Sequence, residues 1–329
     1  SLGATRWSAE GWWPLERLRV PPEVIYPEQL AGLVAPLLEG RIPEVPILLP
    51  ALLVLCPAAP RETIAADATS GPQIVLRLDE SPENPRNSEG DFIQLNDGRI
   101  LFVYTHFTGG GDDYATAHLA GRFSDDGGAT WTQHDAPIVA NTSGMNVMSV
   151  SLLRLNSGEI ALFYLAKNSK LDCRPVMRVS TDEAKTWSEP IEIVPDSQVG
   201  YYVLNNDRVV QLHDGRLLAP VALHTLPDNP QWNDRAIFMC YLSDDNGRTW
   251  RRSRDVRNDE PRPLVLQEPG VVELKDGRLL AFCRTTHGSQ YLSPSADGGE
   301  TWSEFAPSNI ISPCSPASIE RIPSTGDLL

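Results

Sequence analysis

The stretch Ser124-Asp125-Asp126-Gly127-Gly128-Ala129-Thr130-Trp131 decides the fold of this chain. Its pattern, Ser-x-Asp-x-Gly-x-Thr-Trp, recurs in copies that begin at Ser180, Ser243 and Ser295. The tryptophans that end the four copies are 56, 63 and 52 residues apart. A period of this size predicts one supersecondary unit per repeat, with each unit burying its apolar face only against its neighbours.

A hairpin pattern comes before each of these boxes. Ahead of the first box, the apolar runs 92–95 and 100–104 are separated by Asn96-Asp97-Gly98-Arg99, a turn whose glycine takes a positive φ without steric cost. Each unit is predicted to form four antiparallel strands, and radial repetition of such sheets gives an all-β fold, the β-propeller. The later turns are Asn156-Ser157-Gly158, His213-Asp214-Gly215, Lys275-Asp276-Gly277 and, opening a fifth unit, Ser324-Thr325-Gly326.

The residues of the box suit a structural role. The aspartate and the Ser and Thr hydroxyls bond to turn amides, and the glycine takes a left-handed conformation. The tryptophan is predicted to bury its ring between neighbouring sheets. Ala184 stands at the glycine position of the second copy, so that turn is predicted to be strained or differently shaped. The boxes therefore identify the fold and not the chemistry.

Composition limits the partners of the chain. It has 43 acidic and 28 basic residues among 329, a formal net charge of -15. This balance argues against a nucleic-acid surface, and an anionic substrate would have to be held by a local arginine cluster. The five scattered cysteines contain no Cys-x-x-Cys pair, which indicates neither a zinc site nor a disulfide framework. No apolar run reaches the roughly 18 residues of a spanning helix, so no transmembrane segment is expected.

Both ends of the chain depart from the repeat. Residues 1–75 do not share it, the first methionine is Met145, and the chain stops inside the second strand of a blade. We therefore expect a gene fragment or a reading frame extended upstream, with a non-repeat segment at 1–75 and an incomplete propeller of four to four and a half blades at 76–329. The apolar run 46–56, followed by small residues at 65–68, resembles a secretory signal and favours a secreted or periplasmic protein. The alternative is a buried strand or short helix packed against the propeller.

Polar clusters at the start of each unit are the candidate ligand-binding residues, because loops around the innermost strands of a propeller form its ligand face. The clusters differ from unit to unit, as an asymmetric pocket requires. They are 85–89, 144–146, 204–208, 267–269 and 312–315.

From residue 84 to Leu329 the chain resembles the sialidase (neuraminidase) family, six-bladed β-propellers marked by the BNR repeat, or Asp box. The resemblance is strongest over Glu268–Arg284 and from Gly111-Asp112-Asp113 to the first box. It implies an exo-glycosidase that releases a terminal sialic acid with retention, without a metal or other cofactor. Sialidases use a tyrosine nucleophile in place of the usual carboxylate.

The resemblance also implies roles for individual residues. Arg86 and Arg284 match two of the three arginines that grip the substrate carboxylate, which suits the bidentate fork of a guanidinium group. Asp113 matches the acid/base aspartate of a mobile loop, with Asp112 as the adjacent alternative. Glu268 matches the glutamate that assists the tyrosine nucleophile.

Some positions depart from the family pattern. The third arginine and the nucleophilic tyrosine belong to later blades, beyond Leu329, so residues 1–329 alone are expected to be inactive. Arg86 lies in Arg-Asn-Ser-Glu rather than Arg-Ile-Pro, which makes Glu89 an extra carboxylate that would tune the arginine or alter the sugar preference. The other candidate pocket residues are Asn146, Asn206 and Arg208.

Simpler interpretations stay open for each residue. Arg86 would form a surface salt bridge with Glu83 or Glu89, and Arg284 a structural ion pair. Two other functions compete with the sialidase hypothesis. One is a hydrolase or lyase that acts on another acidic sugar, and the other is a non-catalytic propeller that binds glycans.

Overall fold

The computed structural model describes residues 73–258, 264–322 and 324–329 of the chain. The chain divides into two units, Ser1–Pro60 and Arg61–Leu329, and every described residue belongs to the second. The apolar run 46–56 and the small residues at 65–68, which the sequence singled out as a secretory signal, lie outside the described residues. Among the described residues, no helix has the length and apolar character needed to cross a membrane.

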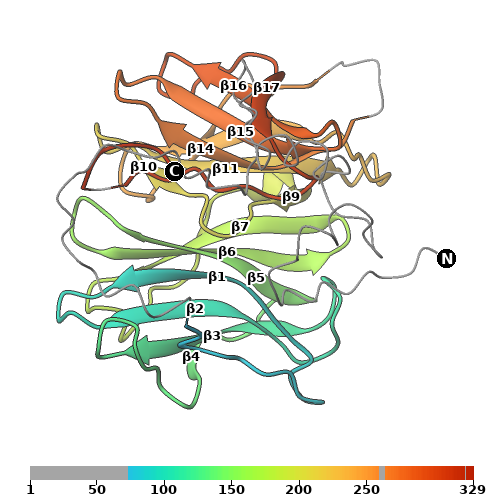
Figure 1. Ribbon diagram of the computed structural model, residues 1–329. Coiled ribbons are helices and arrows are strands. Elements are labelled where there is room, and N and C mark those ends of the chain that lie inside the picture. Colours follow the sequence, from blue (N-terminus) through green and yellow to red (C-terminus); the bar gives the residue numbers. More distant parts are fainter. Residues whose placement is uncertain (1–72, 259–263, 323) are drawn as a thin grey trace, which may run out of the picture. The chain divides into compact units, whose positions relative to one another are not determined.

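Four blades follow one another in chain order and form the propeller (Figure 1). The first and fourth are separate four-stranded antiparallel sheets, whereas the second and third are joined into one nine-stranded sheet by a parallel pairing of Cys173 in the second blade with Tyr201 in the third. The first blade contains β1 (Arg86–Gln94), β2 (Ile100–Phe107), β3 (Ala117–Ser124) and β4 (Ala136–Val139). The second contains β5 (Asn146–Arg154), β6 (Ile160–Ser169), β7 (Asp172–Ser180) and β8 (Ile191–Glu192). The fourth contains β14 (Leu266–Glu273), β15 (Leu279–Thr285), β16 (Ser289–Ser295) and β17 (Ala306–Ile311). The predicted unit of four strands is confirmed.

The third blade departs from this plan because its innermost strand is split. The 3-10 turn η1 (Asp196–Gln198) leads into β9 (Tyr201–Val203), and the strand resumes only at β10 (Val210–Gln211). Both pieces pair with β11 (Leu217–Thr225), which is followed by β12 (Ile237–Ser243) and β13 (Arg251–Arg252). The polar cluster 204–208, predicted to precede this strand, instead interrupts it.

In the first and fourth blades the innermost strand begins earlier than predicted and takes in the polar cluster, whereas β5 begins at Asn146, the last residue of its cluster. The pairing register slips between Ser88 and Asp91 in β1, between Met148 and Ser151 in β5, and between Gln267 and Gly270 in β14. Each slip is a β-bulge, which adds a residue to one strand and re-aims its side chain. The bulges hold non-glycine residues at positive φ, namely Glu89 at 51°, Ser149 at 62° and Glu268 at 52°, and Asp207 of the third blade is at 53°.

The boxes close on themselves as predicted. In the first, Asp126 accepts hydrogen bonds from the Ser124 hydroxyl, at 2.9 Å, and from the amide and hydroxyl of Thr130, at 2.8 and 2.7 Å. The second box makes the same bonds although Ala184 replaces glycine. Ala184 adopts a φ of 61°, a left-handed conformation that strains an alanine. Of the two predicted outcomes, the turn is therefore the strained one: it keeps the hydrogen bonds of the other boxes.

The tryptophans of the third and fourth boxes pack on the preceding blade, whereas Trp131 of the first box packs on phenylalanine rings of its own blade. Trp250 of the third box meets Phe163 of β6 edge to face, with ring centroids 6.3 Å apart. Trp302 of the fourth box meets Phe238 of β12 in the same way at 5.4 Å. Apolar clusters fill the spaces between successive blades, so each sheet buries its faces on its neighbours, as the repeat period predicts.

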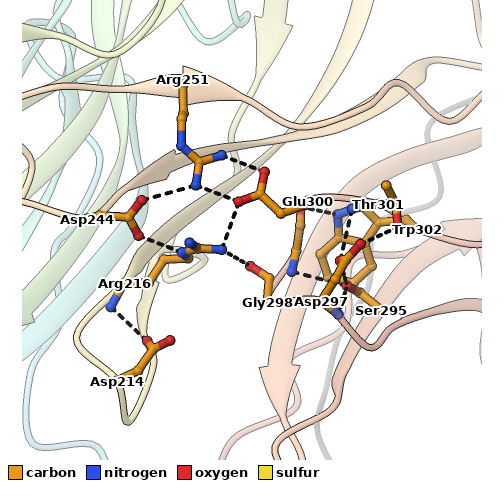
Figure 2. A network of polar contacts seen from close by, with 11 residues as sticks. Asp214, Arg216, Asp244, Arg251, Ser295, Asp297, Gly298, Glu300, Thr301 and Trp302 are labelled. Carbon is orange, nitrogen blue, oxygen red and sulfur yellow. Dashed lines mark hydrogen bonds and ion pairs between the residues drawn. The ribbon is translucent and has the colours of Figure 1, made fainter.

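Ion pairs join the blades near the boxes. Figure 2 shows Arg216 and Arg251 of the third blade sharing the carboxylates of Asp244 and Glu300, the latter from the fourth box. Arg216 also donates to the main-chain oxygen of Gly298 at 3.0 Å. These side chains are partly exposed, so each single ion pair contributes little to stability, and the network contributes more than its separate pairs.

The strand register gives each blade two functionally different ends. Ile100 pairs with Ser124, so the β1–β2 turn and the box lie at the same end of the first blade. Arg86 pairs with Phe107, so Arg86 lies at the opposite end, beside the loop 108–116 that joins β2 to β3. The boxes are thus separated from the candidate site by the length of the strands.

The second box predicts an acid-sensitive contribution to stability. Hydrogen bonds from Thr186 and Ser180 hold the pKa of Asp182 down at about 2, below its ordinary value of 3.8. Because the folded-state pKa is depressed, this stabilisation is complete above about pH 4 and is lost as the pH falls toward 2.

We therefore expect Asp182→Asn to lower the melting temperature at pH 6 by a few degrees. Between pH 4 and pH 2 the melting temperature of this variant should fall less than that of the wild type. Thermal unfolding followed by circular dichroism measures both effects. Asp125→Asn, at an exposed position of the first box, is the matched control and should change neither. Parallel pH curves for wild type and Asp182→Asn would contradict this account of the box.

Candidate active site

The candidate site forms at the end of the blades away from the boxes, where the bulges lie. A left-handed conformation costs a non-glycine residue about 1 kcal/mol or more, so it persists only where the surrounding structure imposes it. In β14 the glycine after the bulge is required, because a Cβ on Gly270 would lie 2.2 Å from the Phe282 ring. A Cβ on Gly90 would likewise lie too close to the Phe102 ring, at 2.4 Å. The two bulges that carry Glu89 and Glu268 are therefore built alike.

Asp113 lies on a short, tightly closed loop and pairs with Arg86. Its Oδ1 atom is 2.6 Å from Arg86 Nη1, and the same nitrogen donates to the Gly111 oxygen at 3.3 Å. The Arg86 guanidinium group also lies over the Phe107 ring, 4.6 Å from its centroid. The Asp113 side chain is 60% exposed and that of Arg86 28%, so the pair lies at the surface of the site and is open to exchange.

Asp112, the adjacent alternative, has a different task. Its Oδ1 atom accepts the Tyr114 amide at 2.8 Å, and its main-chain oxygen accepts the Ala115 amide at 3.1 Å. These bonds close the turn that presents Asp113. Of the two acids, the geometry therefore favours Asp113 as the group that faces Arg86.

Two buried side chains of the second blade hold the main chain of this loop. The Asn146 amide donates to the main-chain oxygens of Asp113, at 3.0 Å, and Ala115, at 2.8 Å. The Lys167 amino group donates to the same Asp113 oxygen at 2.6 Å. Asn146, proposed from sequence as a pocket residue, thus lies behind the loop.

Glu268 and Arg284 form a second charge pair, in the fourth blade. Arg284 Nε lies 3.1 Å from Glu268 Oε2, but its N–H is not aimed at that oxygen, and both buried atoms lack a well-formed hydrogen bond. Arg284 Nη2 donates to Gln267 Oε1 at 2.6 Å. The contact is therefore an ion pair with spare hydrogen-bonding capacity on each side.

The charges of different blades act on one another here. Burial raises the pKa of Glu268 above its ordinary value. The Arg284 charge lowers this pKa, whereas the negative charges of Glu89 and Asp113, from the first blade, raise it. Glu268 thus shares its electrostatic environment with the first-blade acids, as expected if these side chains surround a common space.

Glu89 is bound within the wall of the site. Its Oε2 atom accepts the Ser149 hydroxyl at 2.7 Å, which links the bulges of the first and second blades. Burial raises its pKa, the Ser149 hydrogen bond lowers it, and the Asp113 charge raises it again. The predicted Arg86–Glu89 salt bridge is not the one formed, since Arg86 pairs with Asp113.

Asn206 and Arg208, the remaining candidates, tie blades together. Asn206 donates to the Gly90 oxygen at 3.2 Å, from the third blade to the first. Arg208 is 5% exposed and donates to the Ala317 oxygen at 2.7 Å and the Ser318 hydroxyl at 3.3 Å. Their observed contacts are with protein groups, and their role in a pocket stays a prediction.

The sequence analysis did not single out Lys167 or Ser149, and it did not predict that Gln267 accepts a hydrogen bond from Arg284. Lys167 ends the apolar stretch 160–166, where a single lysine on an otherwise buried strand is a signal that could have been noticed. Ser149 carries no such signal because its importance comes from a bulge. Among the described residues, no group of three or more His, Cys, Asp or Glu side chains is arranged to hold a metal ion.

The repeats and this geometry agree with the comparison to known families. The BNR repeat-like domain matches residues 122–326, more than half of the chain. The chain belongs to the sialidase and BNR-repeat family.

Three similar proteins illustrate the family. A sialidase of Clostridium perfringens is 28% identical over 262 residues, which are 72% of this chain and 66% of the relative. A Dyadobacter fermentans protein of unknown function has a TM-score of 0.60 at 20% identity, covering 74% of each chain. The intramolecular trans-sialidase of Ruminococcus gnavus, solved with oseltamivir carboxylate, has a TM-score of 0.54 at 17% identity, covering 72% of this chain and 73% of its own.

The chain spans slightly less than two thirds of the clostridial relative, and a smaller share, 36%, of a matching sialidase of Bacteroides fragilis. The structural likenesses establish the fold.

The contacts of Arg208 predict that it matters for stability. Arg208→Met should lower the free energy of unfolding by about 3 kcal/mol, because it removes the bond to the partly buried Ala317 oxygen and takes a cation away from Asp207 and Glu320. Urea unfolding followed by tryptophan fluorescence measures this loss. Arg248→Met, at an exposed arginine of the third box, is the control. An unchanged unfolding midpoint for Arg208→Met would make Arg208 a ligand-binding candidate again.

Proposed function

We propose that this protein is an exo-sialidase that releases a terminal sialic acid with retention of configuration. The observation that carries the proposal is the pairing of two arginines of distant blades, Arg86 and Arg284, each with a carboxylate on the same end of the propeller. A planar guanidinium group recognises a carboxylate through two parallel hydrogen bonds, and sialic acid carries such a carboxylate. The sialidase relatives support this substrate class.

Substrate binding then exchanges one carboxylate for another. The substrate carboxylate replaces Asp113 on Arg86 and takes up the Arg284 Nε group, which has no well-formed hydrogen bond. Because the new ion pair at Arg86 replaces the old one with Asp113, little net desolvation is added there. The exchange also frees the Asp113 carboxyl group, so binding of the acid and release of the proton donor are coupled.

In the proposed reaction, Asp113 protonates the leaving oxygen and then activates water. Glu268 takes the proton of a tyrosine that attacks the anomeric carbon, which suits its buried position and raised pKa. The reaction also needs this tyrosine and a third arginine at the substrate carboxylate, and the proposal assigns neither of them to a residue of 1–329. A neutral phenol suits attack on a carbon that bears a carboxylate, since a charged nucleophile would be repelled.

Two alternatives are separated from this proposal by assay. A hydrolase or lyase for another acidic sugar would use the same two arginines. The observation in its favour is Glu89, an extra carboxylate whose charge raises the pKa of Glu268 and which would alter the sugar preference of the site. A panel of uronic acid glycosides and sialosides distinguishes the two. A glycan-binding propeller would bind sialosides without turnover.

Arg284→Lys tests the carboxylate fork. Lysine keeps a positive charge beside Glu268 but cannot form two parallel hydrogen bonds, so kcat/KM for a fluorogenic sialoside should fall about 100-fold, corresponding to roughly 2.7 kcal/mol. The melting temperature should change little. Arg278→Lys, at an exposed arginine of the preceding turn, is the matched control. A sialidase activity that survives Arg284→Lys unchanged would remove Arg284 from the site.

The proposal also predicts that residues 1–329 alone are inactive, because neither the attacking tyrosine nor the third arginine is assigned to a residue among them. Purified 1–329 and the complete protein are compared on the same fluorogenic sialoside, with circular dichroism to confirm that both are folded. Turnover by 1–329 would show that the nucleophile lies within it and would overturn the assignment.

A further inference from the structure

Lys167 is a buried lysine directly behind the loop that carries Asp113. It lies near the end of β6 and is 2% exposed. Its amino group donates to the Asp113 main-chain oxygen at 2.6 Å and contacts Met148 Sδ at 3.1 Å. It also lies over the rings of Tyr114 and Tyr201, 5.2 and 5.5 Å from their centroids.

Burying the ammonium group of a lysine at this position costs free energy, because the charge loses its contact with water. A buried ammonium group is normally compensated by a carboxylate in a salt bridge. No carboxylate of the described residues makes a salt bridge with Lys167, although its charge acts on the buried Glu89 and lowers the pKa of that carboxyl group. A carbonyl oxygen, a thioether and two aromatic faces are weaker partners. Methionine would fill a similar volume without the cost of a buried charge. Packing alone therefore does not account for a lysine at this position.

The loop is held in two separate ways. Its carboxyl group is held by Arg86, a contact that the proposed substrate breaks. Its main chain is held by Lys167 and Asn146, which approach the Asp113 oxygen from the second blade and which the exchange at Arg86 does not touch. Once the substrate has taken Arg86, the side-chain contacts that still hold Asp113 itself are those of Lys167 and Asn146 with its main-chain oxygen.

We propose that Lys167 is a positioning residue, which with Asn146 fixes the main chain at Asp113 so that its carboxyl group stays beside the leaving oxygen after substrate has displaced it from Arg86. This inference rests on the proposed function, since it assigns Asp113 the role of proton donor. It predicts a defect in leaving-group protonation and not in binding.

The test compares two substrates with the same sialic acid and different leaving groups. A nitrophenyl sialoside leaves without much help from an acid, whereas a sialyl-lactose requires protonation. In the complete protein, Lys167→Met should lower kcat for sialyl-lactose about 100-fold and for the nitrophenyl sialoside less than about fivefold, with KM for both nearly unchanged. Asn146→Ser should show the same dependence of kcat on the leaving group, but a weaker one. It replaces Lys167→Met in this test if Lys167→Met does not fold.

Lys170→Met is the matched control. Lys170 also lies over the Tyr114 ring, 4.9 Å from its centroid, so its replacement removes a nearby cation while the bond to the Asp113 oxygen remains. This variant should act on both substrates like the wild type. Equal losses on both substrates for Lys167→Met would make Lys167 merely structural, and no loss on either would overturn the proposal.

A second readout does not depend on catalysis. Hydrogen exchange of the loop amides, such as the Ala115 amide bound to Asp112, should be faster in Lys167→Met than in Lys170→Met by about tenfold. Unchanged exchange would show that Lys167 does not fix the loop, whatever the activity. If the wild type cleaves neither sialoside, the proposed function fails, and the exchange experiment still decides whether Lys167 holds Asp113.

Discussion

At this end of the propeller two partly buried guanidinium groups each form an ion pair with a carboxylate of the protein itself. Arg86 pairs with Asp113 and Arg284 with Glu268, from the first and the fourth blade. The chain has a net charge of -15, so these local pairs, and not the overall field, are what would attract an acidic sugar. In the proposed site, binding is therefore an exchange of partners in which the substrate takes the place of a protein carboxylate.

The rest of the fold keeps these pairs in place. Boxes and ion pairs stabilise the far ends of the blades, where two arginines bind Asp244 of their own blade and Glu300 across the blade boundary (Figure 2). The near ends instead contain strained bulges, and Glu89 and Glu268 occupy left-handed conformations that favour glycine. Stability and candidate function are thus separated along the strands.

Local pattern explains what the sequence alone could predict. The boxes and hairpin turns are short-range features, so blade order, turn positions and the strain at Ala184 followed from neighbouring residues. The resemblance then indicated Arg86, Asp113, Glu268 and Arg284, which the structure places in two ion pairs. Lys167 and the split of β9 from β10 depend on contacts between residues far apart in the sequence, which no local pattern encodes.

The affinity difference between a thio-linked sialoside and its C1 methyl ester tests the central claim most directly. Both compounds keep the sugar, but only the acid can replace Asp113 and engage the Arg284 fork. Titration calorimetry with the complete protein should show the acid binding at least about 100-fold more tightly than the ester. Equal affinities would mean that the two arginines do not recognise a carboxylate, and the account of this site would be contradicted.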